Sequence, residues 1–372
     1  MVILSVFPGC IKPYIYSTFA AMKNLRELTT EQLKVQLAEW GEPAFRVKQI
    51  EEWLWKKFAG SIGEMTSLSK SLREKLNALY FIPKVQIHHT QHSNDGTIKN
   101  RMVLHDGHYI ESVLIPTDKR MTVCVSSQVG CSLSCKFCAT GYLPRKRNLG
   151  FDEIIDQVVA VNEQALTHYG KGLTNIVFMG MGEPLLNYKN VLRAIEKITS
   201  PDSLGMSPRR ITVSTAGVAK MIKQLGEDQV RFKLALSLHA ANDAKRDEIM
   251  PINETNNLNE LVEALNHFYK MTKNEITFEY ILFKNFNDSL KDADELIKLY
   301  RRVPVDLINI IEYNTIDEAA FSKPEEQVTE NFMRYLAAKK VNARLRRSRG
   351  KDIDAACGQL ANVDHPEVAA KA

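Results

Sequence analysis

From about residue 96 onward, short β-rich runs alternate with longer amphipathic segments, and this alternation constrains the fold more than any other feature. The helical patterns include residues 151–166 and 257–271. The candidate strands lie at 175–180, 209–217, 232–240, 276–283 and 306–314. About six such repeats predict parallel strands in a complete or partial βα barrel. The chemistry of such barrels lies at the carboxyl ends of the strands, where this chain carries "GMGEP", "STAG", "SLHAAND" and "EYN".

The region before the barrel has a different sequence pattern. Residues 24–80 read as helices, with apolar faces expected at Val47, Ile50, Leu54 and Phe58 and at Leu68, Leu72, Leu76 and Leu79. Ser67 or Ser69 is the expected N-cap of the second of these helices. Residues 101–116 predict a hairpin that turns at Asp106-Gly107.

The composition is that of an ordinary globular protein, with 44% hydrophobic and 25% charged residues. The formal net charge of +5 permits a nucleic-acid partner without requiring one. No apolar run approaches the roughly 18–20 residues that cross a bilayer, so no membrane association is expected. Residues 1–21 are apolar, but they lack a basic start and are interrupted by Pro8, Lys12 and Pro13. We therefore expect a disordered leader, with Met22 as the true start.

Three of the six cysteines lie within eight residues, at Cys131, Cys135 and Cys138. This C-x3-C-x2-C spacing is one ligand short of an all-cysteine tetrahedral zinc site, whereas thiolates are the usual ligands of iron–sulfur clusters. Three thiolates on a cubane leave one iron open to another ligand. The spacing favours a 4Fe-4S cluster, with Phe137 shielding it from water. A zinc site completed by a distant His or Cys, and plain buried thiols, are the alternatives.

Two further cysteines stand apart from this group. Cys124 precedes Cys131 by seven residues, and Cys357 lies in "AACGQL" near the C-terminus. Taken alone, each is most simply a small buried side chain. The cysteine pattern does not resemble a disulfide scaffold and indicates a reducing, cytoplasmic compartment.

Several motifs in a fixed order carry a resemblance to a known family. They read "CVSSQVGCSLSCKFCATG", "FMGMGEPLLNY", "ITVSTAGV", "LALSLHAAND", "RDEIMPIN" and "SRGKDIDAACGQLA". Together they resemble the radical S-adenosylmethionine (SAM) dual-specificity RNA methyltransferases, over about residues 24–361. The resemblance implies a partial (βα)6 TIM-like radical SAM barrel with a small N-terminal helical accessory domain.

The expected domain organisation follows from these motifs. It comprises the leader at 1–21, an N-terminal helical RNA-binding accessory domain at 22–95, the radical SAM core at 96–345 and a C-terminal segment with the methyl-accepting cysteine at 346–372. The string "PAFRVKQIEEWLWKKF" resembles the accessory domain of the family.

The resemblance also implies a reaction. The family methylates carbon 2 of adenosine 2503 in 23S rRNA and of adenosine 37 in certain tRNAs, with two SAM molecules per turnover and an external electron donor. One SAM methylates the cysteine that matches Cys357, and a second, bound at the cluster, gives the radical that activates this methyl group. The cysteine that matches Cys124 then resolves the protein–RNA crosslink as a disulfide, which must be reduced. Glu111 matches the family's proposed proton acceptor, although such a strand carboxylate is otherwise most often solvated.

The resemblance extends to the residues that contact SAM. By matching motifs they are Gly182, Glu183, Ser214, Ser237, Leu238, His239 and Asn314. Small hydroxyls and backbone groups suit the close approach of a nucleoside, and Glu183 or carbonyls near it can accept from the SAM ammonium group. The resolving step also requires Cys357 to move, and the polar, glycine-containing string "SRGKD" before it predicts a mobile segment.

Basic side chains flank the expected site on both sides. They are Arg145, Lys146 and Arg147 after the cysteines, and Arg344, Arg346, Arg347, Arg349 and Lys351 before Cys357. A charge run is most often a solvated face, but beside an active site we interpret it as phosphate steering with salt-sensitive affinity. The target base must be unstacked, which favours RNA loops. His88, His89 and His92 could suggest a metal site, but their spacing equally suits a surface strand.

Two alternatives to carbon-2 methylation remain open at this point. A sister group of the family methylates carbon 8 of the same rRNA adenosine and confers antibiotic resistance. A non-catalytic iron–sulfur or zinc RNA-binding protein, in which Cys124 and Cys357 are merely buried, belongs to a different class. Nothing in the sequence indicates more than a monomer.

Overall fold

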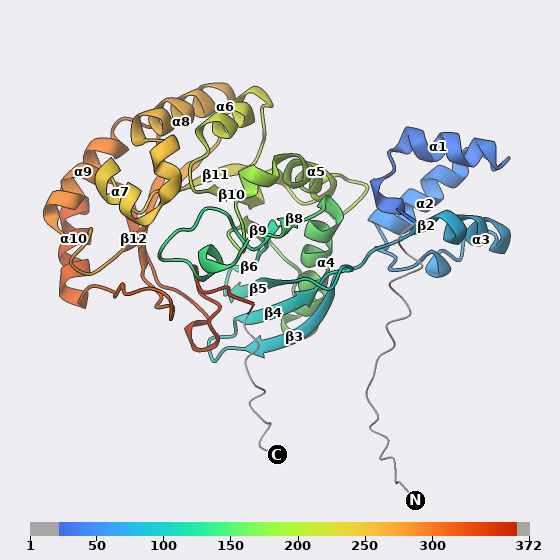
Figure 1. Cartoon of the computed structure of the whole chain (residues 1–372), viewed down its shortest axis with the longest axis horizontal. Coiled ribbons are helices and arrows are strands. Elements are labelled where there is room, and N and C mark those ends of the chain that lie inside the picture. Colours follow the sequence, from blue (N-terminus) through green and yellow to red (C-terminus); the bar gives the residue numbers. More distant parts are fainter. Residues whose placement is uncertain (1–21, 363–372) are drawn as a thin grey trace, which may run out of the picture. The chain divides into compact units, whose positions relative to one another are not determined.

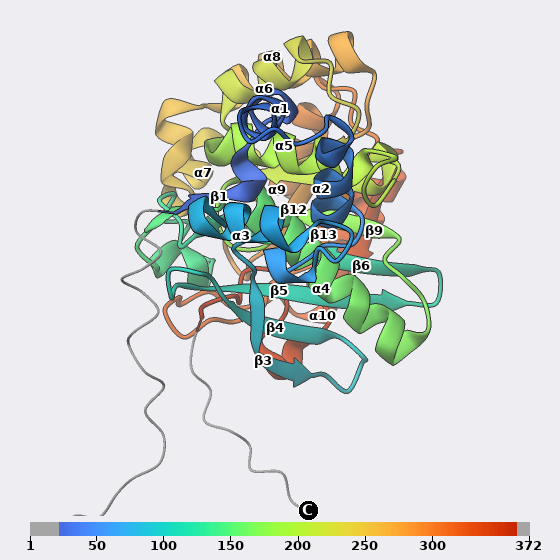
Figure 2. The same ribbon diagram turned by 90° about the vertical axis from the view of Figure 1, so that its right-hand side faces the viewer.

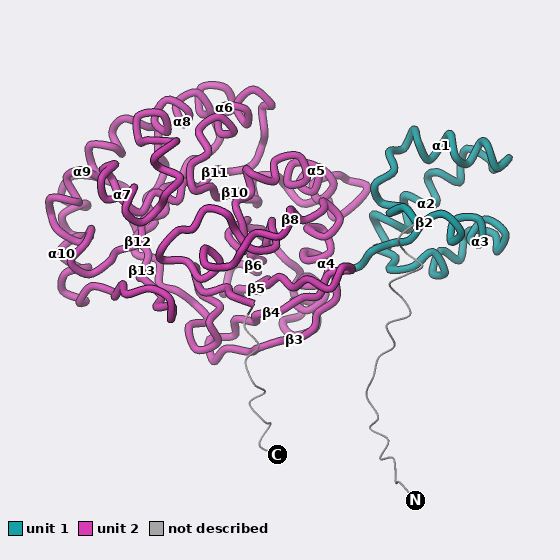
Figure 3. The backbone as a smooth tube through the Cα atoms, in the orientation of Figure 1, with its two compact units in different colours: residues 1–84 teal, residues 85–372 magenta. Residues whose placement is uncertain are grey.

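Two compact units make up the chain, Met1–Lys84 and Val85–Ala372 (Figure 3). The computed structural model describes residues 22–362, so the expected leader at 1–21 lies outside the described residues. The second unit begins well before residue 96, where the sequence placed the boundary. Strand β3, Gln86–His92, pairs with β4, Ile98–Val103, and a boundary after residue 95 would cut this hairpin.

The first unit is helical in its described part, as predicted. Its helices are α1 (Thr30–Glu39), α2 (Phe45–Trp55) and α3 (Lys70–Leu79). The short strands β1 (Lys23–Asn24) and β2 (Tyr80–Phe81) pair in parallel, and two 3-10 turns lie at Leu25–Glu27 and Ile62–Glu64.

Local capping fixes where these helices begin. The Thr29 side chain accepts from the backbone N–H of Gln32, and the Gln32 side chain accepts from the N–H of Thr29, which forms a capping box at α1. Ser69 caps α3 by accepting from the N–H of Leu72. The predicted apolar faces are buried except at Leu79, which ends α3 and is 46% exposed, and at Phe58, which is partly exposed.

A ten-stranded sheet forms the centre of the second unit (Figure 1). Its parallel part is ordered β6-β9-β10-β11-β12-β13-β14. These strands are β6 (Arg120–Cys124), β9 (Asn175–Phe178), β10 (Ile211–Thr215), β11 (Lys233–Ser237), β12 (Ile276–Leu282), β13 (Leu307–Glu312) and β14 (Ala343–Arg346). The five expected strands correspond to β9–β13. Every residue of β12 is buried, as in a parallel strand covered on both faces.

Helices between successive strands cover the outer face of this sheet (Figure 1; Figure 2). They are α4 (Phe151–Tyr169), α5 (Tyr188–Thr199), α6 (Ala219–Glu227), α7 (Asp243–Ile249), α8 (Leu258–Thr272), α9 (Leu290–Tyr300) and α10 (Glu326–Ala338). The result is the predicted partial βα barrel. None of the helices between residues 22 and 362 is long and apolar enough to cross a membrane.

Antiparallel strands extend the sheet on the β6 side. Strand β5 (Tyr109–Thr117) pairs with β6 and with β4, and the β4–β5 hairpin turns at the predicted position, with Gly107 at φ +82°. A separate short pair, β7 (Gln128–Val129) and β8 (Arg147–Asn148), closes the base of the loop that carries the three clustered cysteines. The 3-10 turn Ala139–Tyr142 lies within this loop.

Candidate active site

The carboxyl ends of the parallel strands surround a cavity of about 150 Å³, here called the strand-end cavity. Most of the sequence-predicted site residues line it, namely Cys131, Cys135, Cys138, Gly182, Glu183, Ser214, Ser237, His239 and Cys357. A second cavity of about 260 Å³, the cysteine-pair cavity, is lined by Cys124 and Cys357. The two cavities share Met179, Gly180, Arg346 and Cys357 in their walls. The fold therefore gathers residues from distant motifs at one end of the barrel.

The three-cysteine loop is folded tightly around glycines. Gly130 has φ +72°, and a Cβ there would lie 2.3 Å from the carbonyl oxygen of Pro144. A Cβ at Gly141 would lie 2.7 Å from the carbonyl oxygen of Cys135. The N–H of Lys136 donates to the carbonyl of Ile249 at 3.0 Å, which fastens the loop to the end of α7. The loop thus presents its thiols to the strand-end cavity from a fixed backbone.

These three thiols suit an iron–sulfur cubane, which binds each thiolate at a separate iron. All three line the strand-end cavity. Burial raises the pKa of Cys131 to about 11 and also raises the pKa values of Cys135 and Cys138. Binding a cluster therefore displaces thiol protons.

Glu183 connects the ends of β9 and β10 beside the strand-end cavity. One carboxylate oxygen accepts from the N–H of Leu185 at 3.0 Å, and the other accepts from the N–H of Ala216 at 2.8 Å. Burial raises the pKa of Glu183, against the effect of these backbone donors. A buried carboxylate in a cavity wall suits a cationic partner such as the SAM ammonium group.

Ser214 and Ser237 lie on strands β10 and β11, and His239 follows β11. The two serine hydroxyls lie 3.1 Å apart in the cavity wall. The Nδ1 atom of His239 accepts from the N–H of Ile281 at 3.1 Å, and its ring packs edge-on against Phe137 with centroids 4.7 Å apart. Burial, together with the nearby Arg246, lowers the pKa of His239 to about 3, so this imidazole is neutral.

Leu238 and Asn314 are placed differently from the other predicted SAM contacts, because neither lines either cavity. The Leu238 side chain is fully buried. The Asn314 amide nitrogen donates to the carbonyl of Cys357 at 3.1 Å, while its Oδ1 atom is buried without a hydrogen-bond partner among the described residues. An unsatisfied buried acceptor of this kind fits a ligand donor nearby.

Arg246 is a buried site residue that sequence reasoning missed. Its guanidinium donates to the carbonyls of Leu238 (3.1 Å), Ala216 (2.6 Å) and Ser237 (3.3 Å). It thereby ties together the ends of β10 and β11 beside the cavity. The motif "RDEIMPIN" contains this arginine, but its sequence context gives no sign that the side chain is buried.

Cys124 and Cys357 are free thiols that both line the cysteine-pair cavity. Cys124 ends β6, and burial, with a further contribution from Cys357, raises its pKa to about 12. Cys357 also lines the strand-end cavity, so it borders both the three-cysteine loop and its partner thiol.

The segment that carries Cys357 forms several hydrogen bonds with the rest of the second unit. The N–H of Ala139 donates to the carbonyl of Gly358 at 2.7 Å, and the Thr140 hydroxyl donates to the carbonyl of Leu360 at 2.6 Å. Upstream, the N–H of Gly350 donates to Asp95 at 2.9 Å. The polar string thus forms hydrogen bonds with the fold instead of with water alone.

Glu111 also anchors this segment. It is buried, it lines neither cavity, and one of its oxygens lies 3.5 Å from the Lys99 ammonium group. The other oxygen accepts from the N–H groups of Ala361 (2.9 Å) and Asn362 (3.2 Å). Both oxygens of its carboxylate are therefore engaged in this structure.

The basic residues before Cys357 differ in their surroundings. Arg344 donates to Asn309 at 2.6 Å, and Lys351 pairs with Glu312 at 2.7 Å. Arg346 lines the two cavities. Within β14, Arg344 and Arg346 lie two residues apart and therefore on the same face of the sheet, whereas Arg347, Arg349 and Lys351 follow the strand.

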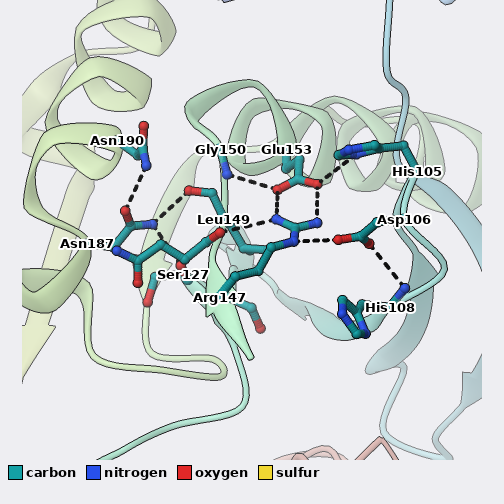
Figure 4. Close-up of polar contacts among 12 residues, drawn as sticks. His105, Asp106, His108, Ser127, Arg147, Leu149, Gly150, Glu153, Asn187 and Asn190 are labelled. Carbon is teal, nitrogen blue, oxygen red and sulfur yellow. Dashed lines mark hydrogen bonds and ion pairs between the residues drawn. The ribbon is translucent and has the colours of Figure 1, made fainter. Parts of the chain in front are cut away.

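Arg147, from the basic run after the three cysteines, pairs with carboxylates of the same unit (Figure 4). Its guanidinium forms a bidentate pair with Glu153 at 2.7 and 2.8 Å and also binds Asp106 at 2.5 Å. The Nδ1 atom of His105 lies 3.3 Å from a carboxylate oxygen of Glu153.

The histidines considered for a metal site, His88, His89 and His92, lie on the sheet-edge strand β3. No metal-binding group is found there within residues 22–362.

A parallel, incomplete barrel with a three-cysteine loop at its strand ends defines a radical SAM protein. Residues 125–300 match the family described as the radical SAM superfamily, and residues 23–82 match the ribosomal RNA large subunit methyltransferase N-terminal domain. Membership of this superfamily implies a 4Fe-4S cluster and SAM binding.

Closer relatives give the particular family. A probable dual-specificity RNA methyltransferase RlmN from Cytophaga hutchinsonii is 56% identical over 93% of this chain and 94% of its own length. Its counterpart from Christiangramia forsetii is 52% identical over 91% and 96%. The crystal structure of a radical SAM methyltransferase from Sphaerobacter thermophilus superposes with a TM-score of 0.85 at 39% identity, covering 91% of this chain and 99% of that one. The chain belongs to the RlmN family of radical SAM RNA methyltransferases.

Proposed function

We propose that this enzyme adds a methyl group to carbon 2 of adenosine 2503 in 23S rRNA and of adenosine 37 in tRNAs. The observation that carries the proposal is the shared cavity of Cys124 and Cys357, directly beside the three-cysteine loop. A methyl carrier must reach both the radical source and its resolving partner, and Cys357 borders both cavities. The dual specificity in the relatives' names agrees with two RNA substrates.

In this proposal Cys131, Cys135 and Cys138 hold a 4Fe-4S cluster. Reductive cleavage of SAM, with an electron from an external donor, supplies a radical that abstracts hydrogen. The SAM contacts would come from Gly182, Glu183, Ser214, Ser237, Leu238, His239 and Asn314. The buried Glu183 carboxylate and the unpaired Asn314 Oδ1 atom are the acceptors that support this assignment. Two SAM molecules are used per turnover, one as the methyl source and one as the radical source.

Cys357 carries the methyl group between SAM and RNA. Its sulfur attacks the methyl of one SAM, the carbon–sulfur bond of the sulfonium breaks, and the thiol proton is lost. After losing a hydrogen atom, the methyl carbon adds to carbon 2 of adenine, which makes a crosslink. The resulting adduct radical must also give up one electron, which the oxidised cluster would accept. Glu111 takes the carbon-2 proton, for which it must exchange its present backbone donors.

Cys124 resolves the crosslink. Its thiolate attacks the Cys357 sulfur, so that a sulfur–sulfur bond forms and the bond from Cys357 sulfur to the methylene carbon breaks. The electron pair of that bond goes to the carbon, which takes up a proton to become the methyl group. An external dithiol then reduces the disulfide.

The remaining parts of the chain have supporting roles. We assign the helical unit that ends at Lys84 to RNA binding, residues 85–345 to the radical SAM core and residues 346–372 to methyl acceptance. The enzyme works in the cytoplasm as a monomer, where its RNA substrates and a reducing environment are found.

The test is methylation of 23S rRNA and tRNA by anaerobically reconstituted enzyme, with the modified nucleoside identified by mass spectrometry. We expect 2-methyladenosine from the native enzyme and no product from Cys357→Ala. Cys124→Ala should accumulate a covalent protein–RNA adduct. 8-Methyladenosine in place of 2-methyladenosine would instead favour the carbon-8 sister group.

Full activity of both cysteine variants would contradict the proposed roles. Family membership already argues against the non-catalytic alternative, because the relatives are enzymes.

A further inference from the structure

Arg346 is a cation whose place in the structure is not explained by RNA steering. It ends β14, and it lines both the strand-end cavity and the cysteine-pair cavity. Its side chain is 30% exposed, in contrast to 73% for the adjacent Arg347. Arg347 also lines the cysteine-pair cavity but not the strand-end cavity, so of these two arginines Arg346 alone borders both cavities.

A buried polar network holds Arg346 in place. Its Nη1 atom lies 3.5 Å from a carboxylate oxygen of Glu279 on β12. The other oxygen of Glu279 accepts from Asn309 at 2.6 Å and from Thr277 at 3.1 Å. Because Glu279 is itself fixed by two neutral donors, it provides a rigid anchor for the guanidinium.

Arg346 reaches across the barrel from this anchor. Its Nη1 atom lies 3.9 Å from the sulfur of Met179, just beyond the end of β9, although β14 and β9 are separated in the sheet by β10–β13. Strand β6, which ends at Cys124, is the neighbour of β9. The curvature of the sheet thus brings a charge from its last parallel strand to the side where the resolving thiol lies.

Arg346 and the two cysteines affect one another's pKa values. The pKa of Arg346 is raised, first by Cys357 and further by Glu279 and Cys124, which outweigh the effect of burial. Burial raises the pKa of Cys124 to about 12, and Arg346 acts in the opposite direction. A thiol so strongly buried is a poor nucleophile unless a cation stabilises its thiolate.

We propose that Arg346 is a positioning residue for the cysteine pair, whose guanidinium, held by Glu279, stabilises anionic sulfur in the cysteine-pair cavity and favours the attack of Cys124 on Cys357. This role rests on the proposed function of the two cysteines. Arg346 acts on the resolving half of the reaction and is not a group that contacts RNA phosphate.

The first test measures disulfide formation without RNA. The cluster-loaded enzyme is incubated anaerobically with oxidised glutathione, and the Cys124–Cys357 disulfide is followed by peptide mass spectrometry under non-reducing conditions. In this exchange the two protein thiols are oxidised and the glutathione disulfide is reduced to two glutathione thiols. We expect Arg346→Gln to slow disulfide formation about tenfold or more, the change that one unit of pKa makes in the thiolate population.

Two variants separate charge from structure. Arg346→Lys keeps the positive charge and should restore most of the rate. Arg301→Gln removes an exposed arginine that follows α9 and lines neither cavity, and it should leave the rate unchanged. Equal rates for Arg346→Gln and Arg301→Gln would overturn the proposal, as would equal slowing by Gln and Lys.

The second test uses the methylation reaction itself. Arg346→Gln should still acquire S-methylcysteine at position 357 and should accumulate the protein–RNA adduct, as Cys124→Ala does. Release of product at the native rate would contradict the role of Arg346. Failure of Cys124→Ala to form any adduct would instead contradict the proposed function, while the glutathione test would still report on Arg346.

Discussion

The two oxygens of the Glu111 carboxylate contact groups from two distant parts of the chain. Lys99 approaches one oxygen from β4, and the N–H groups of Ala361 and Asn362 bind the other. Lys99 and Glu111 are only 3% and 2% exposed. A buried ion pair of this kind is costly to break on one side, because the remaining charge is left without a partner.

Glu111→Gln should therefore destabilise the fold as well as impair proton removal. The amide still offers an oxygen to the two backbone N–H groups, but the Lys99 charge loses its carboxylate, so we expect the free energy of unfolding to fall by about 3 kcal/mol. Chemical denaturation measures this loss. The double variant Lys99→Met/Glu111→Gln should recover most of the stability, and an equally unstable double variant would show that the ion pair is not the cause.

The turn after β9 shows how a short element fixes the strand-end cavity. Gly182 has φ +94°, and a Cβ there would lie 2.5 Å from the Cβ of Gln128. The N–H of the next residue, Glu183, donates to the Gln128 side chain at 2.9 Å. The turn thus packs directly on the strand β7 that closes the three-cysteine loop, and only glycine permits both the conformation and the close approach.

Gly182→Ala should therefore destabilise the protein more than an alanine at another glycine with a positive φ. Gly205, between α5 and β10, has φ +63°, and a Cβ there would meet nothing within 4 Å, so Gly205→Ala carries only the backbone penalty of about 1 kcal/mol. Gly182→Ala adds a clash of roughly 1–3 kcal/mol and should weaken SAM binding. Thermal unfolding and SAM titration measure the two effects, and equal stability of the variants would disprove the packing argument.

At the scale of the whole second unit, one charged cluster connects three segments that are far apart in sequence (Figure 4). His105 and Asp106 come from the β4–β5 turn, Arg147 follows the three-cysteine loop, and Glu153 lies in the first turn of α4. Burial alone would raise the pKa of Glu153, but hydrogen bonds from Arg147 and His105 outweigh it and lower the pKa. The hydrogen bond to Glu153 raises the pKa of His105.

This cluster predicts a pH dependence of stability. Because the pKa of His105 is higher in the folded state, its contribution is complete below about pH 6.5 and is lost as the pH rises through the folded pKa. His105 is 45% exposed, so the contribution is at most about 1 kcal/mol. The unfolding free energy should fall over this range in the native protein and less steeply in His105→Asn. His88→Asn, on β3, serves as the control, and an unchanged slope in His105→Asn would count against the cluster.

The sequence by itself determined the periodic features of this protein. Strand–helix alternation predicted the parallel barrel, turn residues predicted the β4–β5 hairpin, and the order of motifs predicted the cysteine loop and most of the cavity lining. These features depend on local spacing and on side-chain type, which a linear pattern contains. The apolar run 276–283 became the fully buried β12 for the same reason.

Only the tertiary structure decided which polar groups meet. Arg346 and Arg347 are adjacent and alike in sequence, yet Arg346 lines both cavities, whereas Arg347 lines only the cysteine-pair cavity and is 73% exposed. Strand β14 ends between the two residues, and the path of the chain at this point decides the difference. Glu111 binds residues about 250 positions away, and the segment around Cys357 is anchored by contacts that no local pattern contains. Long-range hydrogen bonds form only where the fold brings distant segments next to one another, and that arrangement depends on the whole chain.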